Sequence, residues 1–290
     1  MKLTRNLSIA TILLSTLTLS GCISSTLNGK NIRISKNRIV SSGNVVTKTL
    51  NFGEVTRIKL DGLQDVFVTQ SNRQKIEVKA SDNVMKYGDF RYDNGELTIS
   101  VLNGKDNLQD FDMEVYITVR TLDNIVSSGT GDIEFRGTFR TPTLSMKLNG
   151  TGDIDIPALE CDFLTSILNG TGDISLYGTC ETAKLQLNGT GDIKAQLSCR
   201  SDVNASLTGT GDIRLSGTTH SARYSDSGTG DIYARNMRAE DVRASATGTG
   251  DITCHASQSF TGKTTSITHI TCYGKPKNKD LSTEHYSFPD

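Results

Sequence analysis

The sequence predicts an all-β protein built as a single-stranded, right-handed parallel β-helix with about 20 residues per coil. Three observations lead to this prediction. A pentapeptide recurs at nearly constant spacing, apolar and polar residues alternate on both sides of it, and the chain has 27 glycines but only 4 prolines. Abundant glycine without matching proline argues against collagen and Pro-rich disordered chains, and it favours turns that recur in an ordered protein.

The repeat is the strongest feature of the sequence. Gly-Thr-Gly-Asp-Ile occurs seven times without variation, at spacings of 21, 20, 19, 20, 19 and 20 residues. A degenerate eighth copy ends at Ile270, where Thr268 and His269 replace Gly and Asp. A period near 20 residues is typical of a solenoid. The seven exact copies end at Ile133, Ile154, Ile174, Ile193, Ile213, Ile232 and Ile252.

The residues on either side of the repeat favour strands over helices. The position two residues after each Ile is apolar, as at Leu176. Further apolar sets occur two, four and six residues before the first Gly, for example Leu148, Met146 and Leu144. A period of two predicts a strand with one buried face. Two such segments in each coil leave no room for a helix, which indicates a parallel β-helix.

Stacked coils should align identical residues. Equivalent positions of successive coils lie about 4.8 Å apart. The alternation places both glycines of the motif inward, and it places Thr and Asp outward beside Asn149, Asn169 and Asn188, whose amides can hydrogen-bond in a stack. We therefore expect a ladder of aspartates that comprises Asp132, Asp153, Asp173, Asp192, Asp212, Asp231 and Asp251.

Three interpretations of the Asp ladder are open. Neighbouring carboxylates repel by roughly 1 kcal/mol in water, so the ladder needs compensation. We favour a structural role in which each Asp accepts backbone N–H bonds within its own turn. A Ca²⁺ site is the second interpretation, because Gly-x-Gly-x-Asp is similar to the calcium-binding nonapeptide repeat, although the nine-residue period is absent. Catalysis is the third, and it fits poorly with seven uniform copies.

The first 21 residues are predicted to be a lipoprotein signal peptide. Lys2 and Arg5 precede an apolar stretch from Leu7 to Leu19 that is too short for a membrane span. The sequence that ends at Cys22, Leu-Ser-Gly-Cys, resembles a lipobox, so we expect acylation of Cys22 and stable membrane attachment through several acyl chains. An ordinary signal peptide with a chance cysteine is the alternative. Ile23 stands where an aspartate would resemble an inner-membrane retention signal, which implies the outer membrane.

Four further segments follow the signal peptide. Residues 22–49 are predicted to be a flexible tether; it is basic and lacks acidic residues, which fits either attraction to anionic headgroups or a solvated linker. Residues 50–127 are read as divergent first coils that cap the solenoid and block its strand edge. Residues 128–276 form the regular repeats, and residues 277–290 form a polar tail.

The chain resembles the auto-transporter adhesin, head GIN domain family over roughly residues 50 to 276. The resemblance rests on the segments 60–70 and 82–84, on residues 95–99, on the Gly-x-Gly-Asp-Ile repeats and on the closing Tyr-Gly-Lys-Pro at 273–276. The family often has Ser where this chain has Thr130. The resemblance implies a β-helical fold and a surface or envelope setting, and it transfers no site residues.

Cysteines and histidines give weaker signals. Cys254 and Cys272 occupy the same inward position of consecutive coils, so a disulfide and a pair of buried thiols both fit. Cys161, Cys180 and Cys199 lie about one coil apart. No histidine pair has metal-ligand spacing, so we expect no metal site and no cofactor, with Ca²⁺ on the ladder as the exception.

These features predict a non-enzymatic, outer-membrane-anchored lipoprotein with an adhesin-like binding or envelope-scaffold domain. The formal net charge of −1 leaves no basic surplus for phosphate contacts, so nucleic acid is not an expected partner. The expected partners are the membrane, through the lipid anchor, and a glycan or an envelope protein. The domain can face the periplasm or the cell surface. A polysaccharide lyase or hydrolase and a purely structural periplasmic scaffold are the alternatives.

Overall fold

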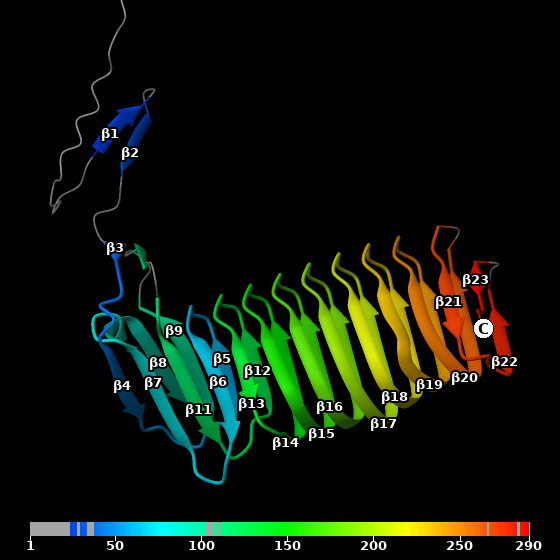
Figure 1. Ribbon diagram of the computed structural model, residues 1–290, viewed down its shortest axis with the longest axis horizontal. Helices are drawn as coiled ribbons and strands as arrows, with labels where there is room; N and C mark the ends of the chain where they lie inside the picture. Colours follow the sequence, from blue (N-terminus) through cyan, green and yellow to red (C-terminus); the bar gives the residue numbers. More distant parts are fainter. Residues whose placement is uncertain are drawn as a thin grey trace, which may run out of the picture.

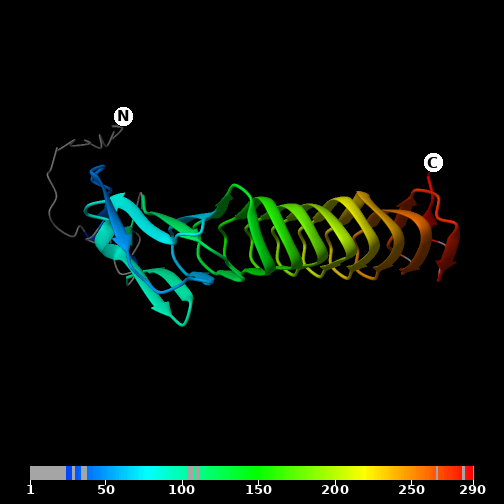
Figure 2. The same ribbon diagram turned by 90° about the horizontal axis from the view of Figure 1, so that it is seen from below.

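The dominant feature of the molecule is a 19-stranded sheet wound into a β-solenoid of about eight turns with about 20 residues per coil. The computed structural model describes residues 24–27, 30–33, 38–102, 107–108, 111–265, 267–282 and 285–289. Figure 1 shows the coils side by side along the long axis, and Figure 2 shows them from below. The predicted solenoid of parallel strands is confirmed.

The regular coils follow the repeat. Each long strand begins at the Ile of a Gly-Thr-Gly-Asp-Ile copy and pairs in parallel with the next, so that Ile154, Ile174 and Ile193 share one register. The strands that begin at the Ile of a copy are β13 (Ile133–Arg136), β15 (Ile154–Leu168), β16 (Ile174–Leu187), β17 (Ile193–Leu207), β18 (Ile213–Asp226), β19 (Ile232–Ala246), β20 (Ile252–Thr264) and, at the degenerate copy, β21 (Ile270–Tyr273). β14 (Phe139–Leu148) follows β13 and pairs with the second part of β15.

The core is a single apolar column inside the coils. In β17, Ile193, Ala195 and Leu197 are buried, while the residues between them are exposed. Leu187 and Leu207 stack in register on the opposite wall, directly before the glycine turn. The two-residue period of the sequence is therefore the period of burial.

The N-terminal coils are not stacked in chain order. The coil made by β5 and β6 lies between the coil of β12 and β13 on one side and that of β9 and β11 on the other, and all these pairings are parallel. The strands are β5 (Arg57–Leu60), β6 (Asp65–Gln70), β9 (Glu96–Val101), β11 (Glu114–Val119) and β12 (Asn124–Ser127).

Antiparallel strands close this end of the solenoid. The predicted cap consisted of divergent coils alone, so the observed cap differs from it. β4 (Val45–Leu50) pairs with β7 (Lys75–Ser81), β7 pairs with β11, and β8 (Gly88–Asp93) forms a hairpin with β9. A short 3₁₀ turn, Met85–Tyr87, precedes β8. The hairpin turns at Asn94 and Gly95, whose φ angles of 46° and 86° suit these residue types. Because β4 belongs to the cap, the ordered domain begins before residue 50.

The C-terminal segment continues the solenoid. β22 (Asn278–Leu281) pairs with β20, and β23 (Tyr286–Ser287) pairs with β21. The rings of Tyr286 and Phe288 pack edge-on against Phe260 at centroid distances of 6.0 and 5.7 Å. The segment read as a polar tail therefore covers the open end of the core with aromatic side chains.

Two small pairings lie outside the main sheet. β1 (Ser24–Leu27) and β2 (Lys30–Arg33) are antiparallel, and β3 (Arg38–Ile39) pairs with β10 (Asn107–Leu108). The signal-peptide prediction for residues 1–21 and the acylation of Cys22 fall outside the described residues. Across the described part of the chain, none of the helical structure is long and apolar enough to cross a membrane.

Candidate functional site

The Gly-Thr-Gly turns bring the backbones of neighbouring coils into close contact. The N–H of Thr190 donates to the carbonyl of Gly170 at 3.0 Å, and the N–H of Thr171 donates to that of Gly150 at 3.1 Å. A Cβ built on Gly172 would lie 2.1 Å from the carbonyl oxygen of Gly152. The glycines are therefore required by close approach between coils, as their predicted inward position implies.

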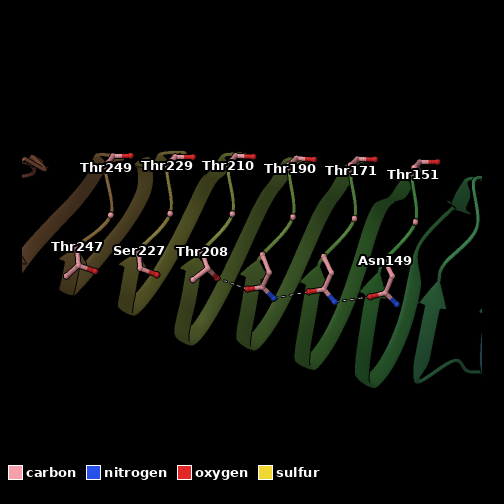
Figure 3. Close-up of a pocket in the computed structure, with 18 of the residues that line it drawn as sticks. Asn149, Thr151, Thr171, Thr190, Thr208, Thr210, Ser227, Thr229, Thr247 and Thr249 are labelled. Carbon is pink, nitrogen blue, oxygen red and sulfur yellow. Dashed lines mark hydrogen bonds between the residues drawn. The ribbon is translucent and has the colours of Figure 1, made fainter.

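This close stacking forms a shallow groove that runs along six coils, with a volume of about 960 Å³ (Figure 3). The glycines of the turns lie between two polar rows. We call this feature the Asn–Thr groove. One row consists of Asn149, Asn169, Asn188, Thr208, Ser227 and Thr247, and the other of Thr151, Thr171, Thr190, Thr210, Thr229 and Thr249.

The two rows differ in their hydrogen bonds. The predicted amide stack is present, because Asn169 Nδ2 donates to Asn149 Oδ1 at 2.8 Å and Asn188 Nδ2 donates to Asn169 Oδ1 at 2.9 Å. Thr208 extends the stack by donating its hydroxyl to Asn188 Oδ1. The six hydroxyls of the second row are exposed and have no hydrogen-bond partner among the described residues. They can therefore both donate to and accept from a ligand.

The Asp ladder lies one residue beyond the second glycine. Each Oδ1 accepts the backbone N–H of the Asp in the next coil, as in the 2.8 Å bond from Asp212 N to Asp192 Oδ1. The ladder begins at Asp65, and it ends where His269 N donates to Asp251 Oδ1. We predicted that each Asp would accept a backbone N–H from its own turn, whereas in the structure it accepts one from the next coil. The same bond joins the ladder residues Asp132, Asp153, Asp173, Asp192, Asp212, Asp231 and Asp251.

The outer oxygens of three ladder carboxylates are paired with other side chains. The Arg214 guanidinium donates to Asp192 Oδ2 at 2.7 Å and to Asp212 Oδ2 at 2.8 Å. The Tyr233 hydroxyl donates to Asp231 Oδ2, and this bond raises the pKa of Tyr233 to about 12. These bonds offset the repulsion between carboxylates at Asp192, Asp212 and Asp231, and the backbone N–H bonds to Oδ1 contribute along the whole ladder. The described residues contain no cluster of three or more His, Cys, Asp or Glu with metal-binding geometry.

We expect Asp192→Ala to lower the free energy of unfolding by roughly 1 to 3 kcal/mol, because it leaves the N–H of Asp212 without its acceptor. Urea denaturation would measure the change. The control is Asp162→Ala, since Asp162 is exposed and its ion pair with Arg200 is 3.8 Å long. Chelator should shift the melting temperature little. A chelator-induced loss of many degrees that only Ca²⁺ restores would instead support the cation interpretation.

The cysteines stack inside the solenoid. Cys254 and Cys272 are paired in register, buried and present as free thiols. Cys180 and Cys199 are also paired in register, with their Sγ atoms 2.8 Å apart. Burial raises the pKa of Cys161 to about 12. Cys161 therefore has little thiolate character at neutral pH, and the four buried cysteines serve as packing elements of the core.

Two features of the structure were not predicted. Asp226 occupies a buried core position directly before a glycine turn. Its position could have been found from the sequence, because it stands two residues before Gly228, where most other copies of the repeat have Leu or Ala. The second feature is a basic pocket that gathers Arg235, Arg238 and His255 from two coils. The sequence hint for the pocket is weak, since it consists of two arginines three residues apart.

Comparisons with known proteins are consistent with this architecture. The family model described as putative auto-transporter adhesin, head GIN domain, matches residues 54–201 and 184–276. No curated protein matches the chain.

Three solved structures are similar in fold. A putative adhesin from Parabacteroides merdae ATCC 43184 has 17% identity and a TM-score of 0.62, with 88% of this chain and 100% of that chain covered. A putative adhesin from Parabacteroides distasonis ATCC 8503 has 18% identity and a TM-score of 0.65, with 87% and 99% covered. A putative lipid binding protein from the same strain has 17% identity and a TM-score of 0.60, with 88% and 100% covered. At these identities the likeness shows the fold alone.

Proposed function

The chain belongs to the auto-transporter adhesin, head GIN domain family, as its motifs predicted, and we propose that it is a non-enzymatic, adhesin-like lipoprotein anchored to the outer membrane. Its solenoid presents the Asn–Thr groove to an extended polar ligand, for which a glycan chain is the best chemical match. An adhesin-like family is consistent with a surface or envelope protein. The lipobox-like sequence that ends at Cys22 supports the anchor.

The unpartnered threonine row is the observation that carries this proposal. Six hydroxyls recur at the coil spacing of about 4.8 Å on one exposed line, and the amide stack runs parallel to them. A polymer with many hydroxyl groups can exchange hydrogen bonds with both rows. Each bond contributes little on its own, so a repeated array favours a long ligand over a small molecule.

The chemistry of the groove supports binding without turnover. Its lining consists of Asn, Thr, Ser and Gly, with Ile267 at one end. Hydrolysis or elimination of a polysaccharide needs a positioned acid or base, and these side chains supply none near neutral pH. The aspartates of the ladder lie nearby, but their Oδ1 atoms accept backbone N–H groups.

A glycan panel tests the proposal against its alternatives. Retention of a glycan without turnover supports a binding module, turnover supports a lyase or hydrolase, and no retention supports a scaffold. The triple variant Thr171→Val, Thr190→Val and Thr210→Val should lower the affinity for a retained glycan about tenfold or more, because three hydroxyls are lost. The control is Thr179→Val with Thr218→Val, since both threonines are exposed on a different part of the coil. An equal loss in both variants would contradict a role for the groove.

The lipid anchor makes a separate prediction. Cys22→Ser should abolish acylation and release the protein from the outer-membrane fraction, because the other features of the signal peptide do not provide a permanent anchor. Membrane fractionation and mass spectrometry of the mature N-terminus would measure both effects. Unchanged outer-membrane fractionation of Cys22→Ser would refute the anchor and would leave the groove untouched.

A further inference from the structure

A basic pocket lies on the C-terminal coils, apart from the Asn–Thr groove, with which it shares no residue. It has a volume of about 460 Å³. Arg235, Asn236 and Arg238 come from β19, His255 comes from β20, and the end of β21 and the turn after it supply the rest. The complete lining is Arg235, Asn236, Arg238, His255, Tyr273, Gly274 and Lys275.

A bulge in β19 creates this pocket. Tyr233 pairs with Thr253 and Arg238 pairs with His255, so five steps along β19 correspond to only two steps along β20. The three additional residues of β19 have no partner in β20, and the alternation of burial breaks there, because Arg235 and Asn236 are both exposed. Bulges of this kind commonly redirect side chains beside functional sites.

The arginines of the pocket are not neutralised by carboxylates. Several other arginines of the solenoid are paired; Arg140 with Glu160 and Arg214 with Asp192 are examples. Arg235 lies over the ring of Tyr273 at 4.1 Å, and neither Arg235 nor Arg238 forms an ion pair with a described carboxylate. Arg235 and Arg238 therefore bring positive charge to the pocket without a carboxylate partner among the described residues.

The walls of the pocket are fixed by packing. The ring of His255 packs against Gly274, where a Cβ would lie 2.8 Å from His255 Nε2. Gly274 has a φ of +92° as well, so a larger residue there would be strained and would push the imidazole away. His255 Nδ1 is buried without a hydrogen-bond partner among the described residues. Burial and the neighbouring Arg238 lower the pKa of His255, which keeps the ring neutral at pH 7.

We propose that this pocket binds a tetrahedral oxyanion, such as a phosphate or sulfate group carried by a small ligand. Guanidinium groups donate paired, charge-assisted hydrogen bonds that match the geometry of such groups. The Tyr273 ring face supports the Arg235 guanidinium, and Arg238 lines the same pocket. The site is independent of glycan binding in the Asn–Thr groove.

Calorimetric titration of the folded chain with inorganic phosphate, and separately with inorganic sulfate, tests the site. We expect saturable binding of one oxyanion in low-salt buffer. The double variant Arg235→Ala with Arg238→Ala should weaken it at least tenfold, because two charged donors are lost. The matched control is Arg243→Ala, since Arg243 is exposed on the same strand and lies outside the pocket. Glucose 6-phosphate should bind and glucose should not.

A second readout follows His255 directly. Binding of an anion beside the ring should raise the pKa of His255 as measured by NMR titration, and this rise should disappear in the double arginine variant. The proposal would be overturned if Arg243→Ala weakened phosphate binding as much as the double variant does. It would also be overturned if neither phosphate nor sulfate saturated the site at millimolar concentrations. The same holds if phosphate did not change the pKa of His255.

Discussion

Gly191→Val should destabilise the folded protein by more than about 3 kcal/mol, beyond the usual effect of overpacking a core. A Cβ on Gly191 would lie 2.0 Å from the carbonyl oxygen of Gly172 and 2.8 Å from its carbonyl carbon. Both atoms belong to the backbone of the preceding coil. They cannot move aside as a flexible side chain does, so the two coils have to separate.

Separation at this point would spread to neighbouring bonds. The N–H of Thr190 donates to Gly170, and the N–H of Thr210 donates to Gly189, so both sides of the coil depend on the same close approach. Each coil of a solenoid is stabilised mainly by its two neighbours. A defect in a central coil therefore weakens two interfaces, whereas a defect at the end of the solenoid weakens one.

Chemical denaturation of three variants would measure the effect. Thr190→Val introduces the same side chain one residue earlier, where the position is exposed, and it should change stability by less than about 0.5 kcal/mol. Thr268→Val lies in the degenerate last repeat, where Thr268 donates to the carbonyl of Ala246, and it should have an intermediate effect. Equal unfolding midpoints for Gly191→Val and Thr190→Val would show that the close approach of the coils is not required.

The regular half of the solenoid could be predicted because its information is local and repeated. The alternation around Ile193 determines which side chains face inward, and the spacing of the pentapeptide determines which residues stack. The partner of each aspartate was harder to predict, because an Asp side chain can reach a backbone N–H in its own turn or in the next coil. The register between coils decides this, and it places Asp212 N 2.8 Å from Asp192 Oδ1.

The N-terminal cap could be predicted only in part. The hairpin at Asn94 and Gly95 follows from local turn chemistry. The placement of β5 and β6 between β9–β11 and β12–β13 depends on contacts between distant segments that carry no repeated motif. The basic pocket has the same difficulty, since the register shift that brings Arg238 beside His255 is not encoded in any short stretch.

Asp226 replaces an apolar residue inside the solenoid, and this should make the stability of the protein depend on pH. Its register neighbours are Leu207 and Ala246, and its side chain is fully buried. One carboxylate oxygen accepts the N–H of Gly228 at 2.8 Å, while Oδ2 has no partner among the described residues. Burial raises the pKa of Asp226 from 3.8 to about 6, and the charges of Asp231 and Asp251 add to this rise.

The direction of the pH effect follows from the raised pKa. The folded state retains a proton that the unfolded chain releases near pH 3.8, so this group contributes most to stability below that pH. The contribution is lost as pH rises through about 6. A shift of this size corresponds to about 3 kcal/mol. Protonation of hydrogen-bonded carboxylates such as Asp112, whose pKa is lowered, opposes the effect in strong acid.

Comparison of the parent chain with Asp226→Leu isolates this contribution. Leucine at this position would extend the stack of Leu187 and Leu207, which already lies against the glycine turns. Between about pH 4 and pH 7, the free energy of unfolding of Asp226→Leu should rise relative to the parent by up to about 3 kcal/mol, because the variant has no carboxylate to ionise in the core. Urea denaturation at several pH values would measure the difference, with Asp202→Leu as the exposed control. A constant difference between the parent and Asp226→Leu across this range would mean that Asp226 ionises in the folded solenoid as it does in water.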